Sequence, residues 1–519
     1  MTVEQIESAL GLRSGSDMPA ASRRSMGKLG LIDEEEGGFP AGAFTLQDAS
    51  LTGAILDGNR GRLVSRWGHI LLRRALASRM DAPRDVPPAD FAAMRAGLLL
   101  RMGEAEAARA LVQDVDPGLY SRKLADTAFD AYVVTADFTG LCPVIQGPLG
   151  ARDDPRWRAQ GAICSAFRGD GANAIRQLDR ALNREEMDRI DLLLAQKYAG
   201  AAGRSRQAVT IEWDGVNAMT PWRYGLTIAV GLEPPERLTR GMGAQYAAVS
   251  AQAPMLGLER RAEAADLAGA SGILSGAAMV DLYGQIHAAP DISGQWSQRA
   301  ELLRGAYVRG DAASRLVAMQ ELWNSASGPV QRYSRQVLTA AAAARLPVDP
   351  QLKDSTGDLI ASMLAAGYDR NALRWGGVVE PGSQGWALLA LADPRRAASA
   401  DSGALDSYID DDDSPEGRKS AFLVAGLAGL GRIDAATKAS LSSRLSLDLD
   451  SETRWTRLIA GAAAKDNQAM VAVLAGLGMQ GSGWDKMTPR HLYRIVEALR
   501  RVGLEAEARM IAAEAVARG

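Results

Sequence analysis

The sequence predicts an all-α protein, and more specifically an α-solenoid of irregular antiparallel helical hairpins. Hydrophobic residues make up 47% of the 519 residues but aromatic residues only 5%, so the core must rest on Ala, Leu, Val and Met. Ala, Leu, Met, Arg and Glu are strong helix formers, whereas the residues that favour strands are sparse. The apolar segments are separated by Gly, Pro and Asp and show helical periodicity.

Two regions are expected along the chain. Residues 1–46 mix Ser, Gly and Pro with the acidic run Glu34–Glu36 and show little periodicity, which predicts a mobile or extended N-terminal tail. Residues 47–519 contain no break long enough to be a domain linker. They are expected to form one continuous helical solenoid.

Three dipeptides mark helix starts. Thr220-Pro221, Ser414-Pro415 and Thr488-Pro489 each place a capping hydroxyl before a proline at the first helical position, where the missing N–H costs nothing. The stretch "AMVAVLAGLGM" at 469–479 is apolar enough for a buried helix but too short to cross a membrane. No transmembrane segment is expected.

A helical hairpin is predicted around Gly103. Phe91, Met94, Leu98 and Met102 share one helical face before this glycine, and an apolar face with Ala108 follows it. The arrangement returns near the C-terminus around Gly503. Pairs of a glycine and an alanine five residues later occur at Gly103/Ala108, Gly169/Ala174, Gly203/Ala208, Gly257/Ala262, Gly367/Ala372, Gly431/Ala436 and Gly503/Ala508.

This spacing resembles the tetratricopeptide repeat family, in which a glycine ends the first helix and a small residue lets the second pack closely. The repeat length of about 34 residues recurs only between Gly169 and Gly203. The aromatic and proline signatures of the family are largely missing. The resemblance therefore implies a degenerate, tetratricopeptide-like array and identifies no particular protein.

Charge and composition argue against several kinds of site. The formal charge is −3 and no long basic run occurs, so no nucleic-acid partner is expected. His69, His287 and His491 lie far apart without metal-ligand spacing, and no cofactor fingerprint is present. The run Asp410–Asp413 lacks the glycine of a calcium loop and is interpreted as negative charge before a helix start. No metal or cofactor is expected.

The two cysteines are candidates for a disulfide. Residues 121–138 are expected to form one helix, the chain reverses at Thr139-Gly140, and Cys142 begins the returning helix. Cys164 lies near the end of the next outgoing helix, on the same edge of the predicted stack. A bond between Cys142 and Cys164 is then possible and would indicate an oxidising compartment such as a periplasm. The alternative is two small buried core residues.

The stretch "VTIEWDGVNAMTPWRYG" at 209–225 contains the best candidate contact surface. Trp213, Trp222, Arg223 and Tyr224 are concentrated there, and aromatic residues and arginine are enriched at binding hot spots. Packing of the same side chains between hairpins is the alternative explanation.

Helical arrays present long surfaces that suit extended partners. We therefore expect a non-catalytic interaction scaffold that binds a protein or another polymer in the cell envelope. A periplasmic location requires a leader absent from the numbered chain, and the cytoplasm is the alternative.

Two alternatives of function remain. One is a cell-wall-acting enzyme or enzyme subunit; "GLGMQGSGW" at 476–484 resembles a Gly-Leu-Met-Gln stretch of lytic transglycosylases, but an extra glycine interrupts it and no Glu-Ser motif precedes it. The other is a cytoplasmic regulatory solenoid that binds peptides. Nothing in the sequence names the partner or the oligomeric state.

Overall fold

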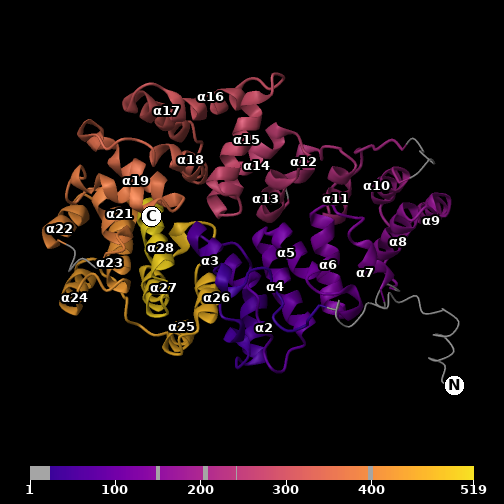
Figure 1. Cartoon of the computed structure of the whole chain (residues 1–519), viewed down its shortest axis with the longest axis horizontal. Helices are drawn as coiled ribbons and strands as arrows, with labels where there is room; N and C mark the ends of the chain where they lie inside the picture. The colour runs from indigo at the N-terminus through magenta and orange to yellow at the C-terminus, as the bar shows by residue number, and fades with distance from the viewer. Residues whose placement is uncertain (1–23, 148–151, 203–208, 241, 396–400) are drawn as a thin grey trace.

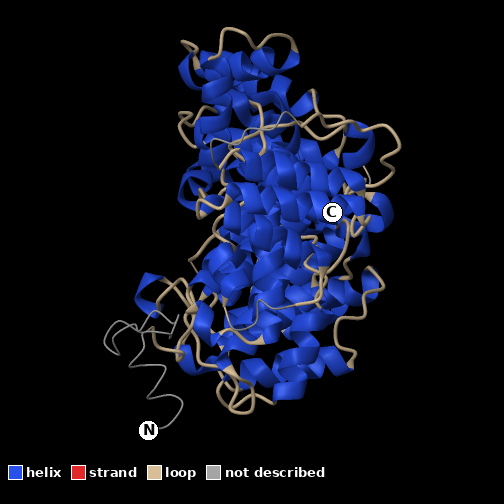
Figure 2. Ribbon diagram, turned by 90° about the vertical axis from the view of Figure 1, so that its right-hand side faces the viewer, coloured by secondary structure: helices blue, strands red, loops and turns tan. Residues whose placement is uncertain are grey.

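The computed structural model describes residues 24–147, 152–202, 209–240, 242–395 and 401–519. This part of the chain consists of helices and connecting loops and contains no β-strand (Figure 2). Three isolated bridges join Leu29 to Met80, Ile32 to Ser78 and Leu63 to Gln480. The predicted all-α class is confirmed.

The first helices run from the middle of the molecule to its right-hand end in Figure 1. They are α2 (Ala49–Gly58), α3 (Arg66–Ala77), α4 (Pro88–Met102), α5 (Ala105–Gln113), α6 (Arg122–Val134), α7 (Cys142–Gln146), α8 (Pro155–Phe167), α9 (Gly171–Asn183) and α10 (Arg189–Gly200).

The chain then returns along the upper side of the same view. This part comprises α11 (Pro221–Ala229), α12 (Glu236–Thr239), α13 (Ala244–Gln252), α14 (Leu258–Ser271), α15 (Gly276–Ala288), α16 (Gln295–Val308), α17 (Ala312–Asn324) and α18 (Pro329–Ala343).

The last helices form the left-hand side, where the C mark also lies beside α28. They are α19 (Thr356–Ala365), α20 (Asp369–Leu373), α21 (Gln384–Ala392), α22 (Ser402–Asp410), α23 (Arg418–Gly429), α24 (Ala435–Arg444), α25 (Arg454–Ala464), α26 (Gln468–Gly478), α27 (Pro489–Arg501) and α28 (Glu505–Arg518). Short 3-10 helices are η2 (Glu34–Glu36), η3 (Ala41–Phe44), η4 (Pro117–Leu119), η5 (Pro350–Ser355), η6 (Arg374–Gly377), η7 (Pro415–Gly417) and η8 (Trp484–Lys486).

Helices that follow one another pack as pairs, and glycines form many of the turns between them. The turns α4–α5, α8–α9, α19–α20, α23–α24 and α27–α28 each contain a glycine with positive φ, namely Gly103, Gly169, Gly367, Gly431 and Gly503. Gly257 differs, since it precedes α14 with a φ of −58°. Gly203 lies outside the described residues.

The alanines five residues after these glycines are mostly buried, as close packing of the second helix requires. Ala108, Ala174, Ala262, Ala372 and Ala508 have no exposed surface. Ala436 is exposed because it lies on the outer face of α24. Ala208 lies outside the described residues.

Two of the three expected helix starts have the predicted cap. The Thr220 and Thr488 hydroxyls accept hydrogen bonds from the third residues of α11 and α27. Ser414-Pro415 instead begins the 3-10 turn η7, because Glu416 and Gly417 both have positive φ and delay the α-helix to Arg418. A carboxylate of the acidic run completes this start, since Asp412 accepts from the backbone N–H of Ser420 at 2.8 Å.

Residues 24–46 lie along the start of the helical region. Leu29, Phe39 and Phe44 are buried. The guanidinium of Arg95 on α4 is fully buried and donates to the Leu29 carbonyl at 2.6 Å and the Ser78 carbonyl at 2.7 Å. The rest of the predicted tail, residues 1–23, lies outside the described residues, so the boundary at 46 stays a prediction.

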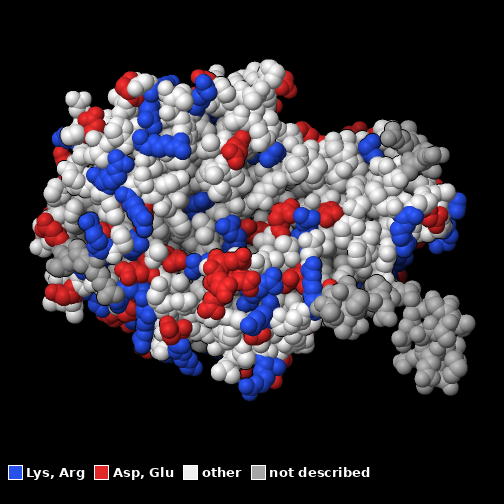
Figure 3. All heavy atoms as spheres, in the orientation of Figure 1, with Lys and Arg blue, Asp and Glu red and all other residues white. Residues whose placement is uncertain are grey.

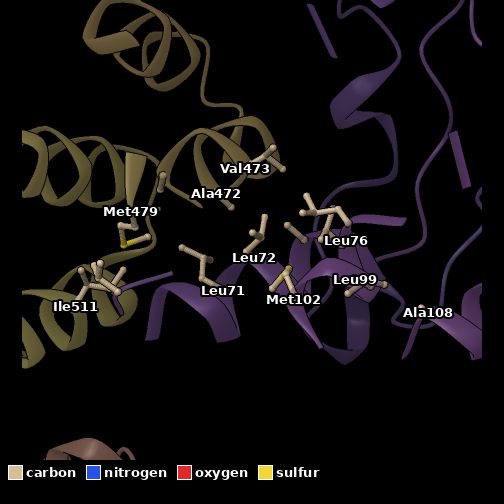
Figure 4. Packing of buried hydrophobic residues seen from close by; sticks show 14 of the residues in the cluster. Leu71, Leu72, Leu76, Leu99, Met102, Ala108, Ala472, Val473, Met479 and Ile511 are labelled. Atoms are coloured by element: carbon tan, nitrogen blue, oxygen red, sulfur yellow. The ribbon is translucent and has the colours of Figure 1, made fainter. Parts of the chain in front are cut away.

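Helix α3 lies beside the end of the chain. It packs against α4 on one side and against α26 and α28 on the other. Figure 4 shows Leu71 and Leu72 of α3 between Met102 of α4 and the C-terminal residues Met479 and Ile511, with Leu76 near Leu99. The final helix, α28, also contacts α19, α21, α23 and α27. The first and last parts of the described chain therefore share one core.

A buried carboxylate fixes this junction. Glu514 of α28 accepts from the Ser65 hydroxyl at 2.6 Å and from the backbone N–H groups of Arg66 and Trp67 at 2.8 and 3.1 Å. Because the first N–H groups of a helix lack partners within the helix, Glu514 caps α3 from the opposite end of the sequence.

Candidate functional site

A cavity of about 780 Å³ lies beside residues 209–220, between α9, α10 and the start of α11. These elements form the upper right of the molecule in Figure 1. The cavity thus borders the stretch that the sequence singled out as a contact surface. Its lining residues are Asp179, Asp188, Arg189, Ile190, Leu193, Gln196, Val209, Thr210, Glu212, Asp214, Gly215, Val216, Asn217, Ala218, Thr220 and Arg223.

One wall of the groove is formed by a segment between α10 and α11. Residues 209–213 belong to no helix, and their side chains alternate: Val209, Ile211 and Trp213 are half-buried, whereas Thr210 and Glu212 are exposed. The structure gives the backbone N–H and C=O groups of residues 209–212 no hydrogen-bond partner in the described chain. Within the residues that the structure describes, this wall therefore presents donors and acceptors without partners beside the groove.

Arg223 fixes the end of this wall to α10. It is 2% exposed. Its guanidinium donates to Asp191 at 2.8 Å and to Asp188 at 2.6 Å. It also bonds the Ala218 carbonyl. Burial acts to lower the pKa of Arg223, but the two carboxylates more than offset it and the pKa is raised. Arg223 is held charged as a structural member of the groove.

Trp222 and Tyr224 point into the interior on either side of Arg223. The Trp222 ring stacks on Phe129 with centroids 5.7 Å apart and meets the edge of Phe138 at 5.3 Å. The Tyr224 hydroxyl lies 2.6 Å from the Ser250 hydroxyl, and burial raises its pKa. Both rings are 2–3% exposed, so they support the groove from below.

Trp213 is the aromatic member of the predicted set nearest the surface. Its ring is half-buried against the core, while its carbonyl accepts from Arg237 at 2.6 Å. Arg237 also bonds the Val216 carbonyl at 2.7 Å. This arginine holds the turn that follows the extended wall.

The groove is acidic. Four carboxylates line it, from Asp179, Asp188, Glu212 and Asp214, against the two arginines Arg189 and Arg223. Asp179 accepts from the Gln196 amide at 2.8 Å, which fixes one of these carboxylates in place. On the face shown in Figure 3, acidic and basic side chains are intermixed, with acidic ones concentrated near the middle of the view.

Asp191 is a buried acid behind the groove. Burial raises its pKa, and Arg223 opposes that effect. Both carboxylate oxygens accept hydrogen bonds from Arg223. The carboxylate is thus committed to an ion pair beneath the groove floor.

The two cysteines are joined in a disulfide that lies apart from the groove. Cys142 begins α7 and Cys164 lies in α8, with their Cα atoms 5.5 Å apart. The buried amide of Gln160 contacts the Cys164 sulfur at 3.4 Å and donates to the Phe138 carbonyl at 2.5 Å. The bond closes the turn between α6 and α8.

Residues suited to hold a metal do not gather anywhere in the described chain, where no three His, Cys, Asp or Glu side chains form such a group. His69 is buried and lies 2.8 Å from Glu104, His287 is exposed, and His491 contacts Thr488 at 2.7 Å. Likewise, no helix that the structure describes is long and apolar enough to span a bilayer.

The sequence stretch that resembles lytic transglycosylases has a structural part in the fold. Gln480 accepts from the Arg60 N–H at 2.6 Å, and the Gly481 N–H donates to the Arg62 carbonyl at 3.1 Å. The glycines before it end α26. These residues join the loop before α3 to the C-terminal helices.

Of the four predicted contact residues, Arg223 lines the cavity and Trp213, Trp222 and Tyr224 do not, while the non-helical wall was not predicted. The available signal was the strand-like alternation of Val209, Thr210, Ile211 and Glu212 in a chain that is otherwise helical. The partners Asp179, Gln196 and Asp188 carry no signal of their own, because they come together only when α9, α10 and α11 pack.

The chain matches no protein-family model, no curated protein and no solved structure at a significant level. The tetratricopeptide-like resemblance is therefore not supported by a family match, and a function has to be argued from the chain's own residues.

Proposed function

We propose that this protein is a non-catalytic scaffold that binds an extended polypeptide in the groove beside residues 209–220. The observation that carries the proposal is the free backbone of the wall. Unpaired N–H and C=O groups in an extended segment can pair with a second extended chain, which adds main-chain hydrogen bonds without requiring a particular sequence.

The acidic side chains of the groove favour a partner that carries positive charge. Glu212 and Asp214 are exposed on the wall, and Asp188 is exposed at the start of α10. A polypeptide bearing Lys or Arg at alternate positions would place its charges near these carboxylates while its backbone follows residues 209–213.

The architecture supports a scaffold as well. We propose that the paired helices form an irregular α-solenoid whose hairpins are tetratricopeptide-like, because a glycine turn followed by a buried alanine recurs at four hairpins of the described chain. Such arrays hold binding surfaces rigid and present them along their length.

We also propose that the protein works in the cell envelope. The disulfide between Cys142 and Cys164 is the supporting observation, since disulfides persist in oxidising compartments. Mass spectrometry of protein alkylated before lysis should find no free thiol. Two alkylated cysteines in that experiment would move the proposal to the cytoplasm.

The binding proposal is tested with a synthetic peptide of four Lys-Val repeats, titrated by calorimetry. We expect one peptide to bind per chain. Replacing two central amides of the peptide by esters should weaken binding about threefold to tenfold for each lost donor, because a net hydrogen bond contributes roughly 0.5–1.5 kcal/mol.

Charge reversal supplies the matched variants. Glu212→Lys with Asp214→Lys should abolish binding, whereas Asp281→Lys with Asp291→Lys, at exposed positions on and after α15, should leave it unchanged. Equal losses in both double variants would contradict the proposal. If soluble cell-wall glycan fragments bind and the peptide does not, the partner is a glycan instead of a polypeptide. Cleavage of these fragments would favour the alternative that the protein is an enzyme.

A further inference from the structure

A second cavity, of about 230 Å³, lies where three distant parts of the chain meet. The loop before α3 and the end of α4 form one side, α13 and α14 form another, and the C-terminal region closes it. The lining residues are Arg60, Gly61, Arg62, Leu63, Val64, His69, Arg101, Met102, Gln245, Ala248, Leu267, Ala270, Ser271, Ile273, Val330, Ser482 and Arg518.

The charge of this lining has one sign. It contains four arginines and a histidine but no aspartate or glutamate. Arg60 and Arg62 are exposed at the cavity, and neither has a carboxylate within 4 Å in the part of the chain that the structure describes. Their charges are therefore available to a ligand.

The loop that carries Arg60 and Arg62 is held from several sides. The Arg60 N–H donates to Gln480 at 2.6 Å, and the Arg62 carbonyl accepts from the Gly481 N–H at 3.1 Å. Gly61 has a φ of +81°, and a Cβ there would come 2.4 Å from the Arg101 backbone. Only glycine fits at this contact, so the backbone of the loop is held against the end of α4 at the point where Arg60 and Arg62 line the cavity.

Arg101 adds a third cation that has only neutral partners. Its guanidinium donates to the carbonyls of Asn59 at 2.9 Å and Leu56 at 2.7 Å. Burial lowers its pKa, with Asp57 opposing that effect. A guanidinium whose hydrogen-bond partners are neutral carbonyls keeps its full charge and favours a nearby anion.

The acids behind the cavity are already committed. Glu104 lies 2.8 Å from His69 and 2.9 Å from Arg73. Glu514 accepts from Arg518 at 2.5 Å in addition to capping α3. Arg518 is thus partly neutralised, whereas Arg60, Arg62 and Arg101 form no ion pair within 4 Å in the described part of the chain.

We infer that this cavity binds a small anion that carries one or two phosphate groups. Guanidinium groups bind phosphate oxygens with two parallel hydrogen bonds, and three of them placed around one space suit a tetrahedral anion with several charges. Ser271, Gln245 and Ser482 add neutral polar groups to the lining. The volume fits a group of this size and is too small for a typical drug-sized ligand.

Such a ligand would hold three separate parts of the chain together. It would contact the loop before α3, the end of α4 and the C-terminal region at once, so its binding must favour the closed arrangement of these parts.

The test is calorimetric titration with inorganic pyrophosphate at low salt, on the full chain. We expect one site per chain and an increase in the thermal unfolding temperature when pyrophosphate is present. Arg60→Gln with Arg62→Gln should weaken binding at least tenfold. The control pair, Arg304→Gln with Arg370→Gln, removes the same charge from exposed positions on α16 and α20 and should leave binding unchanged.

Both changed side chains of the cavity are exposed, so the variant should retain the helical circular dichroism of the unaltered protein. If the glutamine variant loses that helical signal, the variant Arg60→Lys with Arg62→Lys takes its place. It keeps both charges but not the guanidinium groups, and it should bind pyrophosphate more weakly than the unaltered protein. Absence of pyrophosphate binding, equal weakening in the control pair, or equal affinity for citrate would overturn the inference.

Discussion

The side chain of Arg66 joins three segments that lie far apart in the sequence. It is 4% exposed. Its guanidinium donates to the carbonyls of Ala365 at 3.1 Å and Leu274 at 3.2 Å, and it also bonds the Gly269 carbonyl. Burial lowers its pKa, and Glu514 opposes that effect. Helix α3 is thereby attached to the ends of α14 and α19.

Arg66→Lys should destabilise the protein by about 2–4 kcal/mol. An ammonium group cannot reach carbonyls that lie in three directions, and each lost hydrogen bond to a charged group is worth roughly 1.5–3 kcal/mol. Urea unfolding followed by circular dichroism measures the effect. Arg304→Lys, at an exposed position on α16, is the control; identical midpoints for the two variants would refute the role of Arg66.

At the scale of elements, the close packing of α11 against α6 can be tested by replacing one glycine at this contact and one glycine away from it. Gly225 on α11 lies so near α6 that a Cβ would come 2.2 Å from the Val133 carbonyl oxygen, whereas a Cβ at Gly284 on α15 would meet no atom within 4 Å. Gly225→Ala should destabilise by about 1–3 kcal/mol because backbone atoms must move apart. Gly284→Ala should stabilise by up to about 1 kcal/mol through helix propensity. Unfolding midpoints that shift in the same direction would contradict this packing.

The start of α27 should respond to pH through His491. The imidazole is half-buried, stacks on Trp455 with centroids 4.8 Å apart and contacts the Thr488 hydroxyl. Burial, with a contribution from Arg490, lowers the pKa of His491 below its ordinary value of 6.5. As the pH falls, His491 is therefore protonated in the unfolded chain before it is protonated in the folded protein. Its contribution to the free energy of unfolding is complete above pH 6.5 and is lost as the pH falls below that value.

His491→Gln should remove that dependence. Unfolding measured between pH 8 and pH 5.5 should show a smaller loss of stability in the variant than in the unaltered protein. His287→Gln is the control, because that ring is exposed on α15. If the pH dependence of the unfolding free energy is unchanged in His491→Gln but reduced in His287→Gln, His491 is not its cause.

The elements were largely accessible from the sequence, because their signals are local. Gly103, Gly503, Thr220 and Thr488 act on residues within a few positions of themselves, and the structure places turns and caps there. The helix start expected at Ser414-Pro415 was misplaced because Glu416 and Gly417 have positive φ and delay the α-helix to Arg418. Arg223 was recognisable as part of the groove, but its partners Asp188 and Asp191 were not, since pairing of charges across helices leaves no local pattern.

At the scale of the whole molecule, the contact between α3 and α28 was invisible to local patterns. In the sequence, Glu514 is one more acidic residue in an Ala-rich helix. Only the fold shows that it accepts a hydrogen bond from the Ser65 hydroxyl, 449 positions earlier in the chain. The same holds for the arginine cavity, whose lining comes from three separate regions. Helical periodicity identifies apolar faces but does not say which faces meet.

Glu514→Gln should loosen this contact. The amide can still accept at one oxygen, but its NH₂ group would face the donors of Ser65, Arg66 or Trp67. Hydrogen exchange of the Arg66 and Trp67 amides should accelerate by about one to two orders of magnitude, since losing a buried partner costs roughly 1–3 kcal/mol. Glu505→Gln changes a half-buried acid on the same helix and should leave these amides protected. Equal exchange in both variants would show that Glu514 does not hold α3.

The cap that Glu514 provides also sets a time order for biogenesis. A ribosome synthesises Arg66 of α3 448 residues before it reaches Glu514. Until then, the first amides of α3 lack this partner, and the face of α3 that packs against α26 and α28 is uncovered. The start of α3 can be completed only after Glu514 has been synthesised, so a chain that stalls before this residue should remain a substrate for chaperones and proteases.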